Sequence, residues 1–196
     1  MDTRQIEIPD GDLLYGPTFF SPPESRRFLD ELVRTAAWEQ KVIKIYGRQM
    51  PSPRLTAWYG DAGAAYSYSG ISLEPLPWLP VLLEIKARIE SISETRFNSV
   101  LANQYRGGGD SMGWHSDDEP TLGERPVIAS VSFGAARRFI LRHKKKKDLE
   151  RVEFPLGDGD LLVMRGETQK FWKHQVPKTR QQVGVRVNLT FRKIVQ

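Results

Sequence analysis

The second half of the chain is a series of short β-rich segments, and this feature restricts the fold more than any other. Clusters of Gly, Asp and Lys separate the segments from one another. The segments are Phe97–Tyr105, Val127–Phe133, Arg138–Arg142, Arg151–Phe154, Leu161–Met164 and Val183–Phe191. Strands this short and evenly spaced are typical of a jelly roll or a similar β-barrel. We therefore expect a mainly β protein of the α+β class, with a jelly-roll core over residues 96–196.

The first half predicts helices and hairpins that are added to this core. Ser21 precedes two prolines and is followed three residues later by Glu24, a pattern that predicts a capped helix start. A second amphipathic helix is predicted at about Leu79–Ile92. Between the two helices, Lys41–Tyr46 and Leu55–Tyr59 flank a turn rich in Gly and Pro, which predicts a hairpin region. A length of 196 residues fits one domain, so residues 1–95 are interpreted as part of it.

Charge and composition limit the partners and the kind of metal site. The 29 Lys and Arg residues exceed the 24 Asp and Glu residues, which favours a polyanionic partner. Because Cys is absent, disulfides and thiolate metal sites are excluded, and any metal must be held by His and carboxylate. No apolar run approaches the roughly 20 residues of a membrane span, and the N-terminus has no signal-peptide pattern. We expect a bacterial cytoplasmic protein and not a nuclear one. We also expect it to be a monomer that has no membrane partner.

Two of the three histidines are placed to bind a metal. His115 and Asp117 are two residues apart, so on an extended strand both side chains lie on one face. His174 lies between strand-like segments and could supply a third ligand from a neighbouring strand. Two His and one carboxylate form the facial triad that holds Fe(II) in non-haem oxygenases. A lone His-x-Asp pair is weak evidence, because such pairs also cap turns.

Further along the chain, Arg186-Val187-Asn188-Leu189-Thr190-Phe191-Arg192 alternates polar and apolar residues. A period of two places the four polar side chains on one face of a strand. Two Arg side chains inside a barrel are costly without an anionic partner, and a small dicarboxylate would satisfy both. A solvated strand face is the alternative interpretation.

The sequence resembles the AlkB family of 2-oxoglutarate dioxygenases, in the branch of the human nuclear DNA-repair homologues. The resemblance covers most of the chain, from about Lys41 to the C-terminus. The motifs that carry it are Asn103-Gln104-Tyr105, His115-Ser116-Asp117-Asp118-Glu119, Ala129-Ser130-Val131-Ser132-Phe133-Gly134 and the strand 186–192. It implies a double-stranded β-helix, or jelly-roll, core preceded by nucleotide-recognition hairpins.

The resemblance also implies the cofactors and the residues that bind them. Fe(II) would be bound by His115, Asp117 and His174. The co-substrate 2-oxoglutarate would be bound by Asn103, Tyr105, Arg186, Asn188, Thr190 and Arg192, and O2 is the second co-substrate. Arg186 would clamp the distal carboxylate with help from Tyr105, and Arg192 would face the metal-proximal end. The implied reaction converts 2-oxoglutarate to succinate and carbon dioxide and removes a base-linked methyl group as formaldehyde.

The implied substrate is an alkylated base, with 1-methyladenine and 3-methylcytosine in DNA as the first expectation. Such a base must leave its stack at a cost on the order of a few kcal/mol. Tyr46 falls where duplex-active relatives carry an aromatic finger that fills the gap, although an ordinary hairpin tyrosine is the alternative. By position, Tyr68 and His115 would sandwich the base, with Tyr66 and Glu119 near its polar edge.

Basic residues outside these motifs suggest phosphate contacts. Arg54, Lys178 and Arg180 are expected to bind phosphates, which would make binding dependent on salt. The run Lys144–Lys147 is interpreted as a solvated hairpin in preference to a phosphate contact. His143 beside it is expected to be a surface or loop residue without a catalytic role.

Two alternatives to DNA demethylation remain open. The first keeps Fe(II) and 2-oxoglutarate but acts on RNA or protein. The second is a non-catalytic nucleic-acid-binding barrel in which the same three residues hold a structural metal. The two inward-facing Arg residues argue against the second, because such a barrel has no use for a dicarboxylate clamp.

Overall fold

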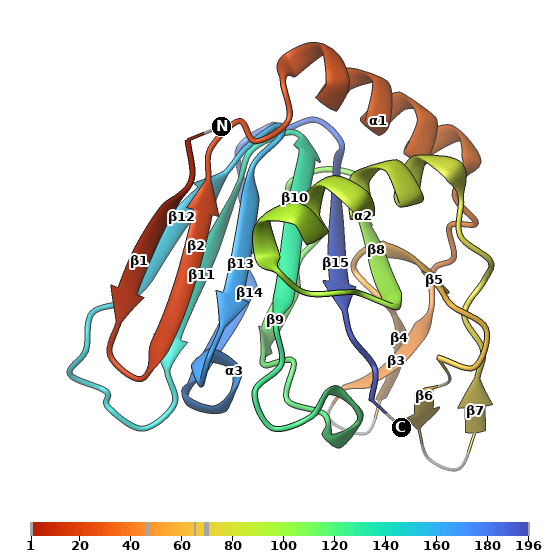
Figure 1. Ribbon diagram of the computed structural model, residues 1–196. Helices are drawn as coiled ribbons and strands as arrows, with labels where there is room; N and C mark the ends of the chain where they lie inside the picture. Colours follow the sequence, from red (N-terminus) through yellow and green to blue (C-terminus); the bar gives the residue numbers. More distant parts are fainter. Residues whose placement is uncertain (1, 46–47, 65, 69–70, 196) are drawn as a thin grey trace.

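Two antiparallel β-sheets form the body of the protein, and two helices lie along the outer face of the larger sheet (Figure 1). The structure is a computed structural model that describes residues 2–45, 48–64, 66–68 and 71–195, with only the backbone described for 43–45, 66–68 and 71–73. Among these residues, none of the helices is long and apolar enough to cross a membrane.

The larger sheet has seven strands and the smaller sheet has four. In spatial order the larger sheet contains β1 (Arg4–Ile8), β2 (Gly11–Gly16), β13 (Leu161–Arg165), β10 (Ile128–Gly134), β15 (Arg186–Arg192), β8 (Ser99–Tyr105) and β5 (Leu55–Gly60). The smaller sheet contains β12 (Val152–Leu156), β11 (Arg137–His143), β14 (Trp172–Val176) and β9 (Met112–His115). Two hairpins are separate, β3 (Val42–Ile45) with β4 (Arg48–Pro51) and β6 (Tyr66–Tyr68) with β7 (Ile71–Leu73).

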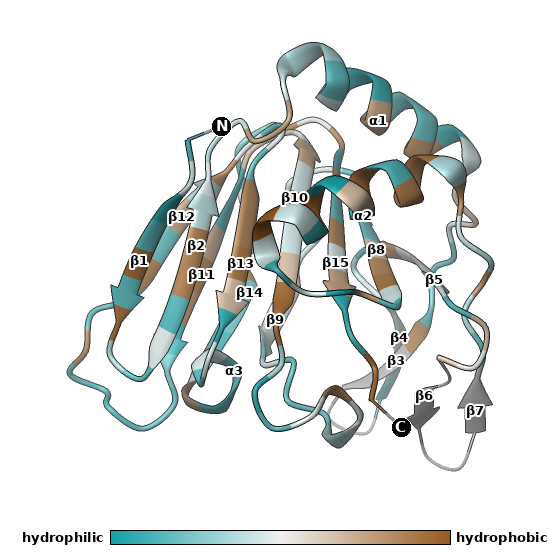
Figure 2. Cartoon of the chain, in the orientation of Figure 1, coloured by the Kyte–Doolittle hydropathy of each residue, from teal (hydrophilic) through white to brown (hydrophobic). Residues whose placement is uncertain are grey.

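The helices cover the larger sheet with apolar side chains. In α1 (Pro22–Thr35), a Glu24 carboxylate oxygen accepts hydrogen bonds from the backbone N–H and the hydroxyl of Ser21 at 2.9 and 2.6 Å, so the predicted helix start is confirmed. The apolar residues of α1 and α2 (Pro80–Ser93) join the core on this face, whereas the edge strand β1 is largely hydrophilic (Figure 2).

Alternation along the strands separates two sides of the larger sheet. In β15, Val187, Leu189 and Phe191 pack in the core beneath the helices. Asn188 and Thr190 line a cavity between the two sheets, and Arg186 is buried on the same side. The predicted alternation and the predicted mainly β fold class are therefore confirmed, and the polar face of β15 is turned inward.

The structure also contains strands that the sequence pattern did not predict. Strands β1 and β2 form a hairpin in which Ile8 pairs with Gly11, and Asp10 in the turn has a positive φ of 58°. Because β1, β2 and β5 belong to the larger sheet, the β core extends beyond the predicted range of 96–196. The last strand begins at Arg186 and not at the predicted residue 183.

Candidate active site

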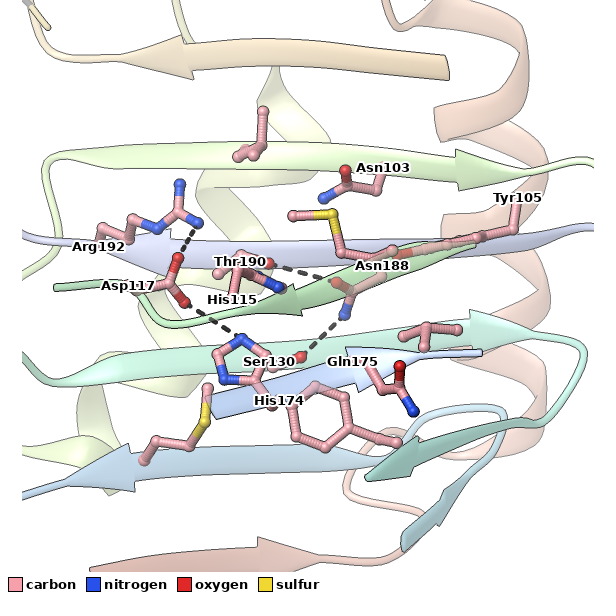
Figure 3. A pocket seen from close by; sticks show the side chains of 15 residues that line it. Asn103, Tyr105, His115, Asp117, Ser130, His174, Gln175, Asn188, Thr190 and Arg192 are labelled. Carbon is pink, nitrogen blue, oxygen red and sulfur yellow. Dashed lines mark hydrogen bonds and ion pairs between the residues drawn. The ribbon is translucent and has the colours of Figure 1, made fainter. Parts of the chain in front are cut away.

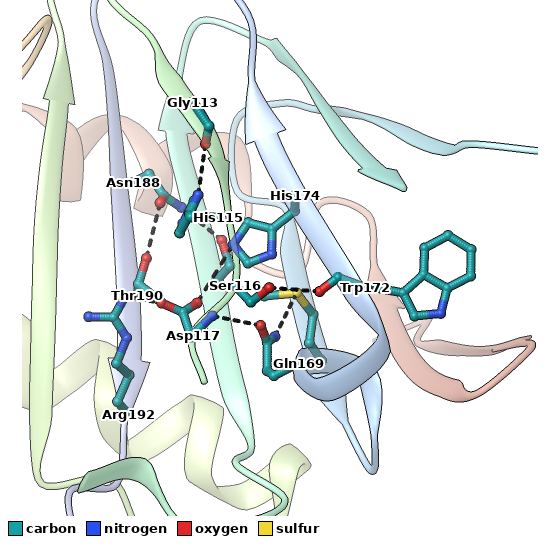
Figure 4. Close-up of polar contacts among 12 residues, drawn as sticks. Gly113, His115, Ser116, Asp117, Gln169, Trp172, His174, Asn188, Thr190 and Arg192 are labelled. Carbon is teal, nitrogen blue, oxygen red and sulfur yellow. Dashed lines mark hydrogen bonds and ion pairs between the residues drawn. The ribbon is translucent and has the colours of Figure 1, made fainter. Parts of the chain in front are cut away.

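Three side chains that could hold a metal meet between the sheets. His115 ends β9, Asp117 follows two residues later, and His174 lies opposite His115 on the neighbouring strand β14. One ligand atom from each residue lies within 4.8 Å of the others. The Nε2 atom of His174 is 3.6 Å from Oδ2 of Asp117 (Figure 4). The three residues fit the facial arrangement that non-haem Fe(II) requires.

Neighbouring groups orient these ligands. Nδ1 of His115 lies 2.9 Å from the carbonyl oxygen of Gly113, so this nitrogen donates a proton and leaves Nε2 free to bind a metal. The Asp117 N–H donates to Oε1 of Gln169 at 2.9 Å, and the Ser116 hydroxyl donates to the Trp172 carbonyl at 3.0 Å (Figure 4). Hydrogen bonds to Gln169 and Trp172 therefore hold the segment that carries Asp117 against the start of β14.

The charge state of the ligands suits metal binding. Burial acts to raise the pKa of Asp117, but the charge of Arg192, with His174 and His115, holds it below its ordinary value. An Arg192 Nη2 group forms an ion pair with Oδ1 of Asp117. Burial, together with the His115 ring, lowers the pKa of His174 to about 3. The carboxylate is thus charged and the buried imidazole neutral near neutral pH, as metal ligands must be.

Gln169, which the sequence analysis missed, accepts a hydrogen bond from the backbone of Asp117, and replacing it tests whether it positions this ligand. Gln169→Leu should weaken Mn(II) binding by about 10- to 100-fold, because Asp117 loses the acceptor that fixes its backbone. The measurement is a Mn(II) titration, with the thermal midpoint recorded alongside. Lys170→Leu, which changes the next and exposed residue, serves as the control. Equal affinities for the two variants would exclude the positioning role.

A cavity with several polar lining residues extends from the triad between the two sheets, over β8, β10 and β15 of the larger sheet. Asn103, Tyr105, Ser130, Asn188, Thr190 and Arg192 are among its lining residues. The Asn188 amide donates to Ser130 Oγ and to the Val131 carbonyl, each at 2.9 Å, and Thr190 donates to Asn188 at 3.2 Å. Tyr105 lies at the opposite end of the lining from Asp117 (Figure 3). The cavity therefore has a metal end and a far end.

Arg186 is the strongest sign of an anion at the far end. Its side chain is 1% exposed, and its guanidinium carbon lies 5.1 Å from the centre of the Tyr105 ring. Nη2 donates to Ser132 Oγ at 2.8 Å, and Tyr105 also acts on the guanidinium, but neither Nε nor Nη1 has a partner with hydrogen-bond geometry among the described residues. Buried unpaired donors of a charged group are costly. A carboxylate would satisfy both donors at once, so the site fits 2-oxoglutarate.

A second, more open cavity of about 280 Å³ adjoins the triad. Its walls are mostly apolar, and sequence reasoning did not identify Trp58, Leu101, Met112, Leu122 or Ile194 as lining residues. Glu119 also lines it, and Oε2 of Glu119 is buried without a hydrogen-bond partner in the described part of the chain. A cavity with apolar walls and a buried acceptor fits a flat heterocycle that carries a hydrogen-bond donor.

The remaining predicted substrate contacts line neither cavity or fall outside the described residues. Arg54 is turned inward, where its Nε donates to Oδ1 of Asn103 at 2.8 Å. Lys178 and Arg180 are exposed in the segment after β14. Tyr46 lies outside the described residues. Tyr66 and Tyr68 belong to β6, but their side chains are outside the description.

The prediction that His143 is a surface or loop residue is wrong. His143 is 3% exposed on β11, where its ring stacks on Phe171 and lies edge-on to Trp172. Nε2 lies 3.1 Å from a carboxylate oxygen of Asp10, and Nδ1 accepts hydrogen bonds from the backbone N–H groups of residues 145 and 146. The imidazole therefore anchors the start of the lysine run.

Within that run, two lysines are held by acidic groups. Lys144 forms an ion pair with Asp118 at 2.8 Å, and Lys146 forms one with Asp10 at 2.7 Å. These contacts organise the hairpin through surface ion pairs, which are individually weak.

Comparisons with known proteins agree with this geometry. Residues 12–192 match the 2OG-Fe(II) oxygenase superfamily. The chain is 47% identical to mouse alpha-ketoglutarate-dependent dioxygenase alkB homolog 3, over 91% of this chain and 64% of that protein. It is 42% identical to human DNA oxidative demethylase ALKBH2, over 78% and 61% of the two chains. It therefore spans less than two thirds of either relative.

A plant relative and a solved structure extend the comparison. The chain is 38% identical to DNA oxidative demethylase ALKBH2 of Arabidopsis thaliana, over 98% of this chain and 69% of that protein. The solved structure of OsALKBH1 superposes with a TM-score of 0.64 at 16% identity, covering 97% of this chain and all of that one. At this identity the structural likeness shows a common fold alone.

Proposed function

Because the chain belongs to the AlkB family of the 2OG-Fe(II) oxygenase superfamily, we propose that it removes alkyl groups from nitrogen atoms of nucleic-acid bases by 2-oxoglutarate-dependent oxidation. The observation that carries the proposal is the pairing of the His115, Asp117 and His174 cluster with the two unpaired Arg186 donors. A metal cluster alone would suit many proteins. The two unpaired Arg186 donors in addition support a carboxylate co-substrate.

The residues of the site would have distinct roles in metal binding and co-substrate binding. His115, Asp117 and His174 would hold Fe(II), which with O2 and 2-oxoglutarate supplies the oxidising chemistry. Arg192 keeps Asp117 ionised, and Arg186 binds the far carboxylate of the co-substrate. For each methyl group removed, one O2 and one 2-oxoglutarate are consumed, and succinate, carbon dioxide and formaldehyde are released.

The second cavity would hold the base. Its apolar walls would pack against the faces of the base, and the free Oε2 of Glu119 is available to a base amino group. The names of the mouse, human and plant relatives support a nucleic-acid substrate. We propose 1-methyladenine and 3-methylcytosine as substrates, each flipped out of its stack, with Tyr46 filling the gap in a duplex.

The test is the release of succinate and formaldehyde from oligonucleotides that contain 3-methylcytosine, as single-stranded DNA, duplex DNA and RNA. We expect turnover on at least one DNA form. Tyr46→Ala should lower the rate on duplex by about tenfold and leave single-stranded turnover nearly unchanged, because only the duplex has a gap to fill. Met50→Ala, on β4, four residues after Tyr46 in the sequence and 45% exposed, is the matched control.

Each outcome has a distinct meaning. If wild-type protein releases no formaldehyde from any of the three oligonucleotides, the substrate proposal fails. If the Met50 and Tyr46 variants lose duplex activity equally, the segment contributes as a whole and Tyr46 is no specific wedge. Faster turnover on RNA than on DNA would move the proposal to an RNA substrate.

A further inference from the structure

Two buried guanidinium groups lie against one tyrosine at the far end of the co-substrate cavity. Arg137 on β11 is 3% exposed and lies 5.6 Å from the centre of the Tyr105 ring, while Arg186 on β15 lies 5.1 Å from the same centre. The two arginines come from different sheets. Neither forms an ion pair with a carboxylate in the described part of the chain.

The hydrogen bonds of Arg137 connect two loops to this end of the barrel. Nη1 donates to the Gly107 carbonyl at 3.0 Å, and Nη2 donates to the carbonyls of Asp110 and Pro177 at 2.8 and 2.7 Å. The first two acceptors lie in the loop that follows β8 and Tyr105, and the third follows β14. One planar guanidinium therefore holds both loops next to the tyrosine ring.

These acceptors are neutral carbonyl groups. The nearby Asp110 carboxylate forms its ion pair with Arg106, so it offsets the charge of Arg137 only in part. Burial lowers the pKa of Arg137 and also that of Arg186. Tyr105 opposes both shifts, Asp110 opposes the shift of Arg137, and Asp160 opposes that of Arg186, whereas the charge of Arg137 lowers the pKa of Arg186 further. Arginine nevertheless remains charged in proteins. The far end thus holds two positive charges in a poorly solvated place, an arrangement that disfavours the empty site and favours an anion.

We propose that Arg137 is a positioning and specificity residue of the co-substrate site, which holds Tyr105 beside Arg186 and adds a second positive charge that selects 2-oxo acids with a second carboxylate. Arg186 contacts the second carboxylate of the co-substrate directly. Arg137 acts on it indirectly, by positioning Tyr105 and by the electrostatic field of its positive charge. The inference rests on the use of 2-oxoglutarate by this chain. It does not depend on the nucleic-acid substrate.

The next residue along β11 provides a matched control. Arg138 points to the other face of the strand, where it is exposed and forms a two-pronged ion pair with Glu153 at 2.5 and 2.7 Å. Arg138→Gln therefore removes the same charge from the same strand without touching the cavity.

The experiment measures equilibrium binding to Mn(II)-loaded protein without oxygen. The ligands are 2-oxoglutarate and 2-oxobutyrate, which keeps the 2-oxo acid group but lacks the second carboxylate. Arg137→Gln should weaken 2-oxoglutarate binding by about tenfold and change 2-oxobutyrate binding by less than about twofold, because only the second carboxylate faces the lost charge. Arg138→Gln should change neither.

Equal weakening of both ligands, or no weakening of 2-oxoglutarate binding, would overturn the inference. If Arg137→Gln does not fold, Arg137→Lys takes its place, since lysine keeps the charge but cannot reproduce the planar fork. Arg137→Lys should weaken 2-oxoglutarate binding by less than Arg137→Gln does and should leave 2-oxobutyrate binding unchanged. Equal weakening of both ligands would again contradict the inference. If wild-type protein does not bind 2-oxoglutarate, the proposed function itself fails, together with the role assigned to Arg137.

Discussion

Replacing Asp117 with asparagine should lower succinate formation by at least about a hundredfold and weaken Mn(II) binding to a similar degree. Asparagine keeps the shape of the side chain but removes the negative charge on which both the metal and Arg192 depend. Asp117 is 2% exposed, so water cannot replace the lost carboxylate easily. Arg192 would also lose its ion-pair partner and add a positive charge beside the metal. The measurements are succinate release and a Mn(II) titration.

Asp118→Asn is the control for this prediction. Asp118 is the next residue and is equally acidic, but it is 54% exposed and its carboxylate pairs with Lys144. The control should keep metal affinity within about threefold of wild type, because a surface ion pair contributes little. If both variants bind Mn(II) as wild type does, the metal is not held by Asp117. If both lose it, the segment as a whole has been disturbed.

The central strands were predictable because their signal is local. Strand β15 alternates polar and apolar residues, β10 places two serines between apolar residues at the same spacing, and β13 begins with a short apolar run. The edge strand β1 carries Arg, Gln and Glu beside its two isoleucines, so its sequence does not distinguish a strand from a surface loop. It becomes a strand because β2 pairs with β13 and offers a free edge.

Part of the candidate site could also be predicted from the sequence, because the signal for those residues is local. His115 and Asp117 are close in sequence, and the polar face of β15 appears as a pattern within seven residues. Gln169 contacts the backbone of Asp117 from 52 residues away, and a local sequence pattern cannot predict a contact over that separation. His143 was misread because it precedes a lysine run, although pairing with Trp172 across β11 and β14 buries it. Arg137 and Trp58 also acquire their roles only when the two sheets are brought together.

Arg186→Met should raise the apparent Kd for 2-oxoglutarate by on the order of a hundredfold, because a buried charged donor to the carboxylate is lost. The same change should not lower the free energy of unfolding of the ligand-free protein. Methionine has a similar length and no unpaired N–H groups, whereas Nε and Nη1 of Arg186 have no partner in the described residues. Binding loss without a stability loss is expected only where the charge serves a ligand.

The measurement is denaturant unfolding of the Mn(II)-loaded protein with and without 2-oxoglutarate. At 100 times its Kd, the ligand should stabilise wild type by about 2.7 kcal/mol, and the same concentration should stabilise Arg186→Met by much less. Arg142→Met is the control, since Arg142 is a partly exposed arginine stacked on Trp114 and does not line the cavity. It should keep the full stabilisation by the ligand. A large drop in the ligand-free stability of Arg186→Met would instead show that Arg186 is a structural residue whose charge the protein itself satisfies.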